Sequence, residues 1–266
     1  MRPVGEMRVA LGIAYRGSAY SGWQSQPGGR TIQDRLDAAL SAFAGAPLHS
    51  ICAGRTDAGV HALNQVVHLD ATVERSLDAW VRGTNRYLPG DIAVQWCRFV
   101  PDAFHSRATA IGRRYLYLLL ESPVRPALET GLAGWTFRRL DGEAMRRAAE
   151  ALVGVHDFSA FRSAECQALS PVKTMRRITI ERRGAYWRLE FDADAFLHHM
   201  IRNIVGCLVA VGSAAKPASW VADVLASRDR SLAAATFSPD GLYFLGPYYD
   251  PVHAIPECTP AMDWLP

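Results

Sequence analysis

The sequence predicts an α+β protein made of two ferredoxin-like (RRM-like) halves, with a mainly antiparallel central sheet flanked by helices. Two observations carry this prediction. In each half, strand and helix patterns alternate in the order of the split βαβ unit. The hydrophobic share of 49% and the charged share of 21% are ordinary for a globular protein, and 266 residues suffice for two cores. No sequence repeat relates the halves, so the duplication is inferred from topology alone.

The first half opens with alternating apolar residues over 9–15, which predict a strand. Thr31, followed three residues later by Asp34, is typical of a helix N-cap. Apolar residues at helical spacing continue to Phe43, and Gly45 ends the predicted helix. The other elements expected here are a strand, a helix and a strand, over residues 65–69, 77–88 and 92–99.

The second half opens with an alternating strand over 113–120, with Tyr115 on one of its faces. A helix is expected to begin near Asp141 and to reach its C-terminal end at Gly154. The remaining predicted elements are a hairpin that turns at Gly184, an apolar helix and a closing strand, over residues 175–183, 185–193, 197–212 and 242–249.

The boundary between the halves is expected where prolines and polar residues interrupt the pattern within 100–112. The predicted domains are therefore 1–106 and 107–250, followed by an irregular, proline-rich tail over 251–266. The N-terminal residues lack the apolar core of a signal peptide, and the longest apolar stretch, 204–215, is too short to span a bilayer. We expect no membrane association.

Cysteine and charge give two further constraints. The five cysteines are widely spaced and include no C-x-x-C, so we expect neither a zinc site nor a disulfide framework, and a cytoplasmic location. The net charge of +3 does not by itself demand a polyanionic partner. However, only Lys173 and Lys216 are lysines. GC-rich codon usage explains such a skew by itself, and the arginines that make up the rest can still grip phosphate and stack on bases wherever they cluster.

One short loop concentrates the features of a reactive site. Asp57 lies between Gly54 and Gly59, with Arg55 two residues before it and a histidine four residues after it. Glycines permit tight turns and close approaches, and loops held by a rigid scaffold often carry catalytic groups. Asp and Gly are also ordinary turn residues, so local composition alone leaves a plain turn as the alternative.

Motifs for other chemistries are absent from the sequence. It contains no H-E-x-x-H, no Walker loop, no G-x-G-x-x-G and no G-x-S-x-G. His198 and His199 are adjacent, so on a helix their rings would diverge by about 100°, and we expect no metal there. A single loop carboxylate with arginines and tyrosines remains as the candidate site.

Six blocks, in order along 9–249, match one family. They cover residues 15–26, 31–40, 54–62, 104–117, 156–171 and 196–206. In these blocks the sequence resembles the TruA-type tRNA pseudouridine synthases, which implies the pseudouridine synthase fold and conversion of uridine to pseudouridine. That reaction has no redox step and no net hydrolysis, so the resemblance implies neither a cofactor nor a metal.

The resemblance assigns a role to each of four residues. Asp57 becomes the catalytic carboxylate, and attack at C1′, addition at C6 of the base and removal of the C2′ proton all stay open. Arg202 is implied as the cation that keeps Asp57 ionised; by itself it is the lone charge in an apolar helix, either exposed or paired. Tyr115 is implied to stack on the base, and otherwise packs in its sheet. Arg55 is implied to hold phosphate or to replace the flipped nucleotide, and otherwise lies at the surface.

The resemblance also implies the partners. The substrate would be tRNA, modified at uridines 38 to 40 of the anticodon arm, with each base flipped out of its stem or loop. A homodimer is implied, with one tRNA contacting both subunits. Two rival functions are a non-catalytic RNA-binding module and a uridine-cleaving glycosidase, and the latter lacks the second acid that such enzymes usually need.

Overall fold

The computed structural model describes residues 7–257, which form two compact units. The first unit comprises residues 7–111 and 244–257, and the second comprises residues 112–243. Within the described residues lie ten strands and five α-helices, and the strand pairing is mostly antiparallel. This composition confirms the predicted α+β class.

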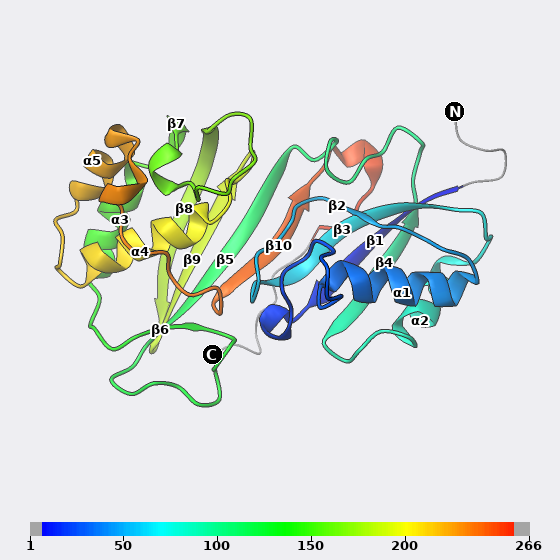
Figure 1. The fold of residues 1–266 in the computed structure, drawn as a ribbon. Helices are drawn as coiled ribbons and strands as arrows, with labels where there is room; N and C mark the ends of the chain where they lie inside the picture. The colour runs from blue at the N-terminus through cyan, green and yellow to red at the C-terminus, as the bar shows by residue number, and fades with distance from the viewer. Residues whose placement is uncertain (1–6, 258–266) are drawn as a thin grey trace. The chain divides into compact units, whose positions relative to one another are not determined.

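The first unit contains an antiparallel sheet in the order β4-β1-β3. The short strand β2 pairs with β3, and β10 also lies beside β3. These strands are β1 (Met7–Tyr15), β2 (Ile51–Cys52), β3 (His61–Ala71), β4 (Ile92–Phe99) and β10 (Leu242–Tyr248), of which the first two residues of β10 belong to the second unit. Figure 1 shows helices α1 and α2 side by side against this sheet.

Helix α1 (Ile32–Ala44) begins and ends as the sequence predicts. The side-chain oxygen of Thr31 accepts a hydrogen bond of 3.2 Å from the backbone N–H of Asp34, which satisfies one unpaired donor of the first turn. Gly45 ends the helix with a φ of 74°, a conformation that glycine adopts without strain. Helix α2 (Leu77–Asn85) begins at the predicted residue 77 and ends three residues before the predicted end at 88.

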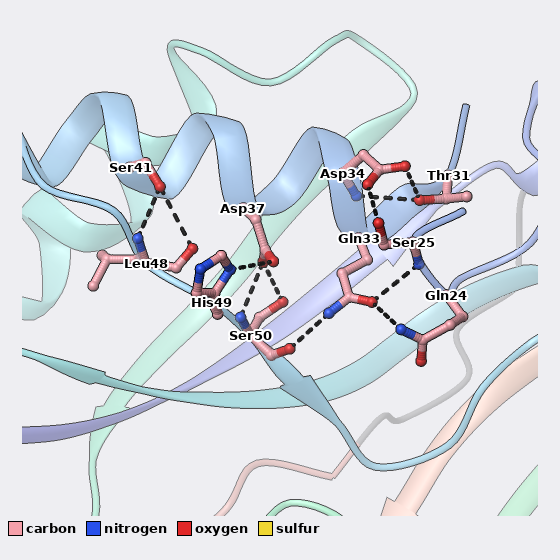
Figure 2. A network of polar contacts seen from close by, with 10 residues as sticks. All are labelled: Gln24, Ser25, Thr31, Gln33, Asp34, Asp37, Ser41, Leu48, His49 and Ser50. Atoms are coloured by element: carbon pink, nitrogen blue, oxygen red, sulfur yellow. Dashed lines mark hydrogen bonds and ion pairs between the residues drawn. The ribbon is translucent and has the colours of Figure 1, made fainter. Parts of the chain in front are cut away.

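A network of polar side chains fixes α1 to the segments on either side of it (Figure 2). The Gln33 side chain donates to the backbone oxygen of Ser50 at 3.0 Å and accepts from Gln24 at 2.9 Å. Oδ1 of Asp37 accepts from both the backbone N–H and the hydroxyl of Ser50, at 3.0 and 2.5 Å. The residue that precedes β2 is therefore held against α1.

The second unit contains an antiparallel sheet in the order β5-β9-β8-β7, with the short strand β6 parallel to β5. The hairpin of β8 and β9 turns at Gly184, as predicted, with a φ of 60°. The strands are β5 (Gly112–Glu121), β6 (Gly134–Thr136), β7 (Gly154–Asp157), β8 (Val172–Arg183) and β9 (Tyr186–Ala193).

Three helices belong to the second unit: α3 (Gly142–Glu150), α4 (Met200–Gly212) and α5 (Trp220–Ser227). Helix α3 packs on β8 and on α4 (Figure 1). The Asp141 carboxylate caps α3 by accepting from the backbone N–H groups of Glu143 and Ala144 at 2.9 and 3.0 Å. Most of α4 is buried, which explains its apolar sequence.

Three expectations about these elements need correction. Helix α4 begins at Met200 and not at residue 197, because His199 has a φ of 62°, outside the helical range. Helix α3 ends at Glu150, and Gly154 is instead the first residue of β7. In the predicted tail, residues 251–253 form a 3-10 turn, whereas 258–266 lie outside the described residues, as do 1–6.

Two other properties follow from residues 7–257. No helix in that range has both the length and the hydropathy needed to cross a bilayer. The four cysteines within it, Cys52, Cys97, Cys166 and Cys207, are all free thiols. Burial raises the pKa of the Cys97 thiol to about 12, which disfavours the reactive thiolate. At Cys166 burial is outweighed by hydrogen bonds with the backbone of Ala168 and His198 and by the charge of Arg162, so the pKa of that thiol is lowered.

Candidate active site

Asp57 lies in the connection between β2 and β3 of the first unit. Its backbone oxygen accepts a hydrogen bond of 3.2 Å from the N–H of Val60, which closes a turn. Gly59 completes this turn with a φ of 81°, a region that other residues adopt only with strain. Asp57 itself is half-buried, and Arg55 is exposed. The loop therefore presents one carboxylate and one guanidinium from a fixed backbone.

The glycine-rich segment 15–26 packs directly on this loop. The N–H of Trp23 donates to the backbone oxygen of Thr56 at 3.0 Å. Gly22 has a φ of 90°, and a Cβ atom there would lie 2.7 Å from the same oxygen. A Cβ on Gly17 would lie 2.0 Å from the backbone oxygen of Val60. Glycine at both positions is what allows this close approach.

His61, the histidine of the candidate loop, has a structural role. It is buried at the start of β3, and its Nδ1 accepts a hydrogen bond of 3.1 Å from the backbone N–H of Gly17. Because an accepting ring nitrogen carries no proton, this contact requires a ring that is unprotonated at Nδ1. His61 thus joins the loop to the segment packed on it.

Tyr115 and Arg202 belong to the second unit. Tyr115 lies on β5 opposite Phe191 of β9, with 9% of its surface exposed. Its ring meets that of Phe196 edge to face, with 5.2 Å between the centroids. The packing therefore orients Tyr115 firmly.

Arg202 lies in the first turn of α4 and is half-buried. Its Nε donates to the backbone oxygen of Phe237 at 2.8 Å, and the N–H of Phe237 donates back to the Arg202 backbone oxygen at 3.2 Å. Using Nε for this contact fixes the plane of the guanidinium. The sequence predicted that Arg202 is either exposed or paired. In the structure its side chain is hydrogen-bonded to the backbone of Phe237.

Asn203 is a residue that sequence reasoning missed. It is fully buried, and its Nδ2 donates to the backbone oxygen of Phe161 at 2.7 Å. Its Oδ1 accepts from Arg230 at 3.0 Å and from the hydroxyl of Thr236 at 2.7 Å. The segment that orients Arg202 is therefore itself held by Asn203. The available signal was an amide inside an otherwise apolar helix.

The expectation for His198 and His199 was wrong in its geometry. Neither residue lies within α4, because the helix begins after them. Their ring centroids are 4.0 Å apart with 37° between the planes, so the rings do not diverge as they would on a helix. The left-handed backbone of His199 is the physical reason for this difference.

The comparisons with known proteins can be set against this geometry. A family model described as tRNA pseudouridine synthase matches residues 12–107 and 148–250. The chain belongs to the tRNA pseudouridine synthase family. Arg55, Asp57 and Arg202 lie within the two matched segments, whereas Tyr115 lies between them.

Individual members of the family are similar over almost the whole chain. The tRNA pseudouridine synthase A of Methylibium petroleiphilum is 67% identical over 260 residues, covering 98% of this chain and 100% of the relative. Its counterparts in Polaromonas naphthalenivorans and Paracidovorax citrulli are 63% and 61% identical, with the same coverage. The similarity therefore includes both units and is not confined to the Asp57 loop.

Proposed function

We propose that this protein isomerises uridine to pseudouridine in tRNA, with Asp57 as its catalytic carboxylate. The observation that carries the proposal is the match of the family model across the Asp57 loop, whose backbone the structure fixes through glycines and hydrogen bonds. The full-length relatives support the same activity, because each is named for it.

The reaction needs only one carboxylate. The N1–C1′ bond of uridine breaks, the base turns over, C5 bonds to C1′, the proton on C5 is released to solvent, and N1 takes up a proton from solvent. A glycosidase usually protonates its leaving group with a second acid. Uracil leaves as a stabilised anion, so no such acid is required. Attack at C1′, addition at C6 and removal of the C2′ proton each assign Asp57 to a different first step.

Three further residues have proposed roles. Arg202 would favour the ionised form of Asp57, since a nearby cation stabilises a carboxylate. Its hydrogen bond to Phe237 supports this role by keeping the guanidinium in one orientation. Tyr115, already oriented by Phe196, would stack on the target base. The exposed Arg55 would contact phosphate or fill the place of the flipped nucleotide.

The substrate and setting follow from the same resemblance. We propose that the targets are uridines 38 to 40 of the anticodon arm, that the enzyme acts in the cytoplasm, and that it works as a homodimer. The preponderance of arginine over lysine supports RNA binding, because the guanidinium grips phosphate with two parallel hydrogen bonds. Shape and phosphate contacts would hold the folded RNA.

Tritium release tests the activity. A tRNA transcript carrying 5-tritiated uridine is incubated with the protein, and solvent tritium is counted alongside the mass of the RNA. The isomerase releases one tritium per converted uridine and leaves the mass otherwise unchanged. A transcript with cytidine at positions 38 to 40 is the matched control for the site. Absence of release from every tRNA would refute the proposal, and free uracil would point to a glycosidase instead.

A further inference from the structure

We propose that Tyr15 and Gln65 are positioning residues that grip the Asp57 loop from inside the first unit and set the direction of Asp57. The inference rests on the proposed function only for the role of Asp57. The grip itself is a feature of the structure: two buried polar side chains, one from β1 and one from β3, hold the residues that flank Arg55.

Gln65 holds Gly54. Its side chain is fully buried on β3, and its Nε2 donates to the backbone oxygen of Gly54 at 2.5 Å. The backbone N–H of Gly54 donates in return to Oε1 of Gln65 at 3.4 Å. The side-chain amide of Gln65 thus pairs with both the N–H and the carbonyl oxygen of Gly54, as the backbone of a neighbouring strand would. Two backbone groups that a loop leaves without a ladder partner are satisfied in this way.

Tyr15 holds Thr56. It is the last residue of β1, with 4% of its surface exposed, and its hydroxyl lies 2.8 Å from Oγ1 of Thr56. The tyrosine ring also packs against Trp23, with 5.9 Å between the centroids. Burial raises the Tyr15 pKa well above its ordinary value, outweighing the hydrogen bonds with Thr56 and Gln65 that lower it. The hydroxyl therefore keeps its proton at any working pH.

These anchors account for the directions of the loop side chains. Thr56 is buried, whereas Arg55 before it is exposed and Asp57 after it is half-buried. With residues 54 and 56 tied to the inside of the unit, the intervening Arg55 is exposed and Asp57 follows at a fixed point of the backbone. Displacement of a reacting group by about 1 Å can cost on the order of a hundredfold in rate. By fixing the residues next to Asp57, this network would control the position of the carboxylate and therefore the rate of the chemical step.

The prediction concerns kcat rather than binding. Thr56→Val preserves the shape of the side chain and removes its hydroxyl, and Tyr15→Phe removes the partner hydroxyl. We expect each change to lower kcat about tenfold or more with KM for tRNA within about twofold. Thr56→Ser keeps the hydroxyl and should retain most of kcat. The double variant should lose little more than the worse single variant, because the two hydroxyls act as one contact.

Tyr243→Phe is the matched control for loss of a buried tyrosine hydroxyl. The Tyr243 hydroxyl donates to the backbone oxygen of Leu132 in the second unit, and the residue is 2% exposed. This control should leave kcat unchanged. Gln65→Leu extends the test to the second anchor and should also lower kcat. Urea unfolding of each variant identifies any that lose stability, and these are then assayed well below their unfolding midpoint.

The kinetic constants are measured by tritium release, and amide hydrogen exchange is followed in the peptide that covers 53–60. The inference holds if the anchor variants lower kcat and accelerate exchange in this peptide while Tyr243→Phe does neither. Unchanged kcat, or losses that match the control, would overturn it. A wild-type protein without activity would refute the proposed function instead. In that case hydrogen exchange alone tests whether Tyr15 and Gln65 hold the loop, and unchanged exchange in the anchor variants would overturn the inference.

Discussion

The backbone oxygen of Thr56 accepts a hydrogen bond from the N–H of Trp23 at 3.0 Å, one residue before the candidate catalytic carboxylate. The contact brings the segment that carries Trp23 against the Asp57 loop. Tyr15 and Gln65 also contact the loop, from β1 and β3. The carboxylate is thus presented by a segment that is held by several contacts, although it lies outside any regular helix or strand.

Gly22→Ala should disturb this arrangement. A non-glycine residue at its φ of 90° is strained by about 1–3 kcal/mol, and the new Cβ would also lie 2.7 Å from the Thr56 oxygen. We expect a large loss of kcat. Gly28→Ala is the matched control, since Gly28 has a φ of 113° but no atom within 4 Å of the added Cβ. Equal activity in the two variants would show that the close contact is unimportant.

Asn203→Leu should destabilise the protein. The change leaves the Phe161 oxygen without its buried donor and removes the acceptor of Arg230 and Thr236. We expect a loss of about 2–4 kcal/mol in the free energy of unfolding, measured in urea. Thr236→Val removes one of these contacts, together with the hydrogen bond from Arg230 to the Thr236 hydroxyl, and should cost less because the amide keeps its bonds to Phe161 and Arg230. A variant as stable as the wild type would contradict the role given to the amide.

Arg202→Lys should lower kcat about tenfold or more even though the charge is kept. Lysine has no counterpart of the Nε group that donates to Phe237, so the cation loses its fixed orientation. The matched control is Arg188→Lys in the same unit, which removes an Nε hydrogen bond of 2.9 Å to Glu190. Single-turnover tritium release compares the two. Similar rates would mean that a positive charge at position 202 suffices.

Asp37→Asn should stabilise the protein at pH 7. Burial raises the pKa of Asp37, and the hydrogen bonds from Ser50 and the charge of His49 only partly oppose this. A raised carboxyl pKa means that the folded chain holds the proton more tightly than the unfolded chain. The stability linked to that proton is full below the unfolded pKa and is lost as pH rises through the folded one.

The amide oxygen of asparagine can still accept both Ser50 hydrogen bonds, which end on the same Oδ1 atom in the structure. The extra stability of Asp37→Asn over the wild type should therefore decrease as pH falls towards about 4, where the wild-type carboxyl becomes protonated. Urea unfolding at several pH values measures this trend. If the free energies of unfolding of the variant and the wild type instead moved further apart as pH falls, the predicted direction would be refuted.

Local signals predicted the longer elements well. Helix α1 carried its N-cap, apolar face and C-cap glycine in the sequence, and the hairpin of β8 and β9 was marked by Gly184. The missed elements β2, β6, β7 and α5 have two, three, four and eight residues. Such short segments hold too little periodicity to detect, because their pairing partners and tertiary packing define them.

The candidate site was partly foreseeable. The glycines around Asp57 predicted a shaped loop, and the structure adds what shapes it. The anchors Tyr15 and Gln65 lie on strands, where a tyrosine and a glutamine give no sign that they contact loop residues 41 and 11 positions away. The helical backbone predicted for His199 was wrong. Its left-handed conformation follows from the surrounding fold, and histidine as a residue type does not indicate it. Contacts distant in sequence therefore set the limit of prediction.

The most direct test of the account is single-turnover tritium release by Asp57→Asn. Asparagine keeps the size of the side chain and removes its charge, so the loop and the RNA contacts should persist. We expect release no faster than without enzyme, with tRNA affinity within a few-fold of the wild type. Asp70→Asn, which removes the carboxylate paired with Arg8 at 2.8 Å, should react normally. Release by Asp57→Asn at the wild-type rate would contradict the central claim that this carboxylate performs the chemistry.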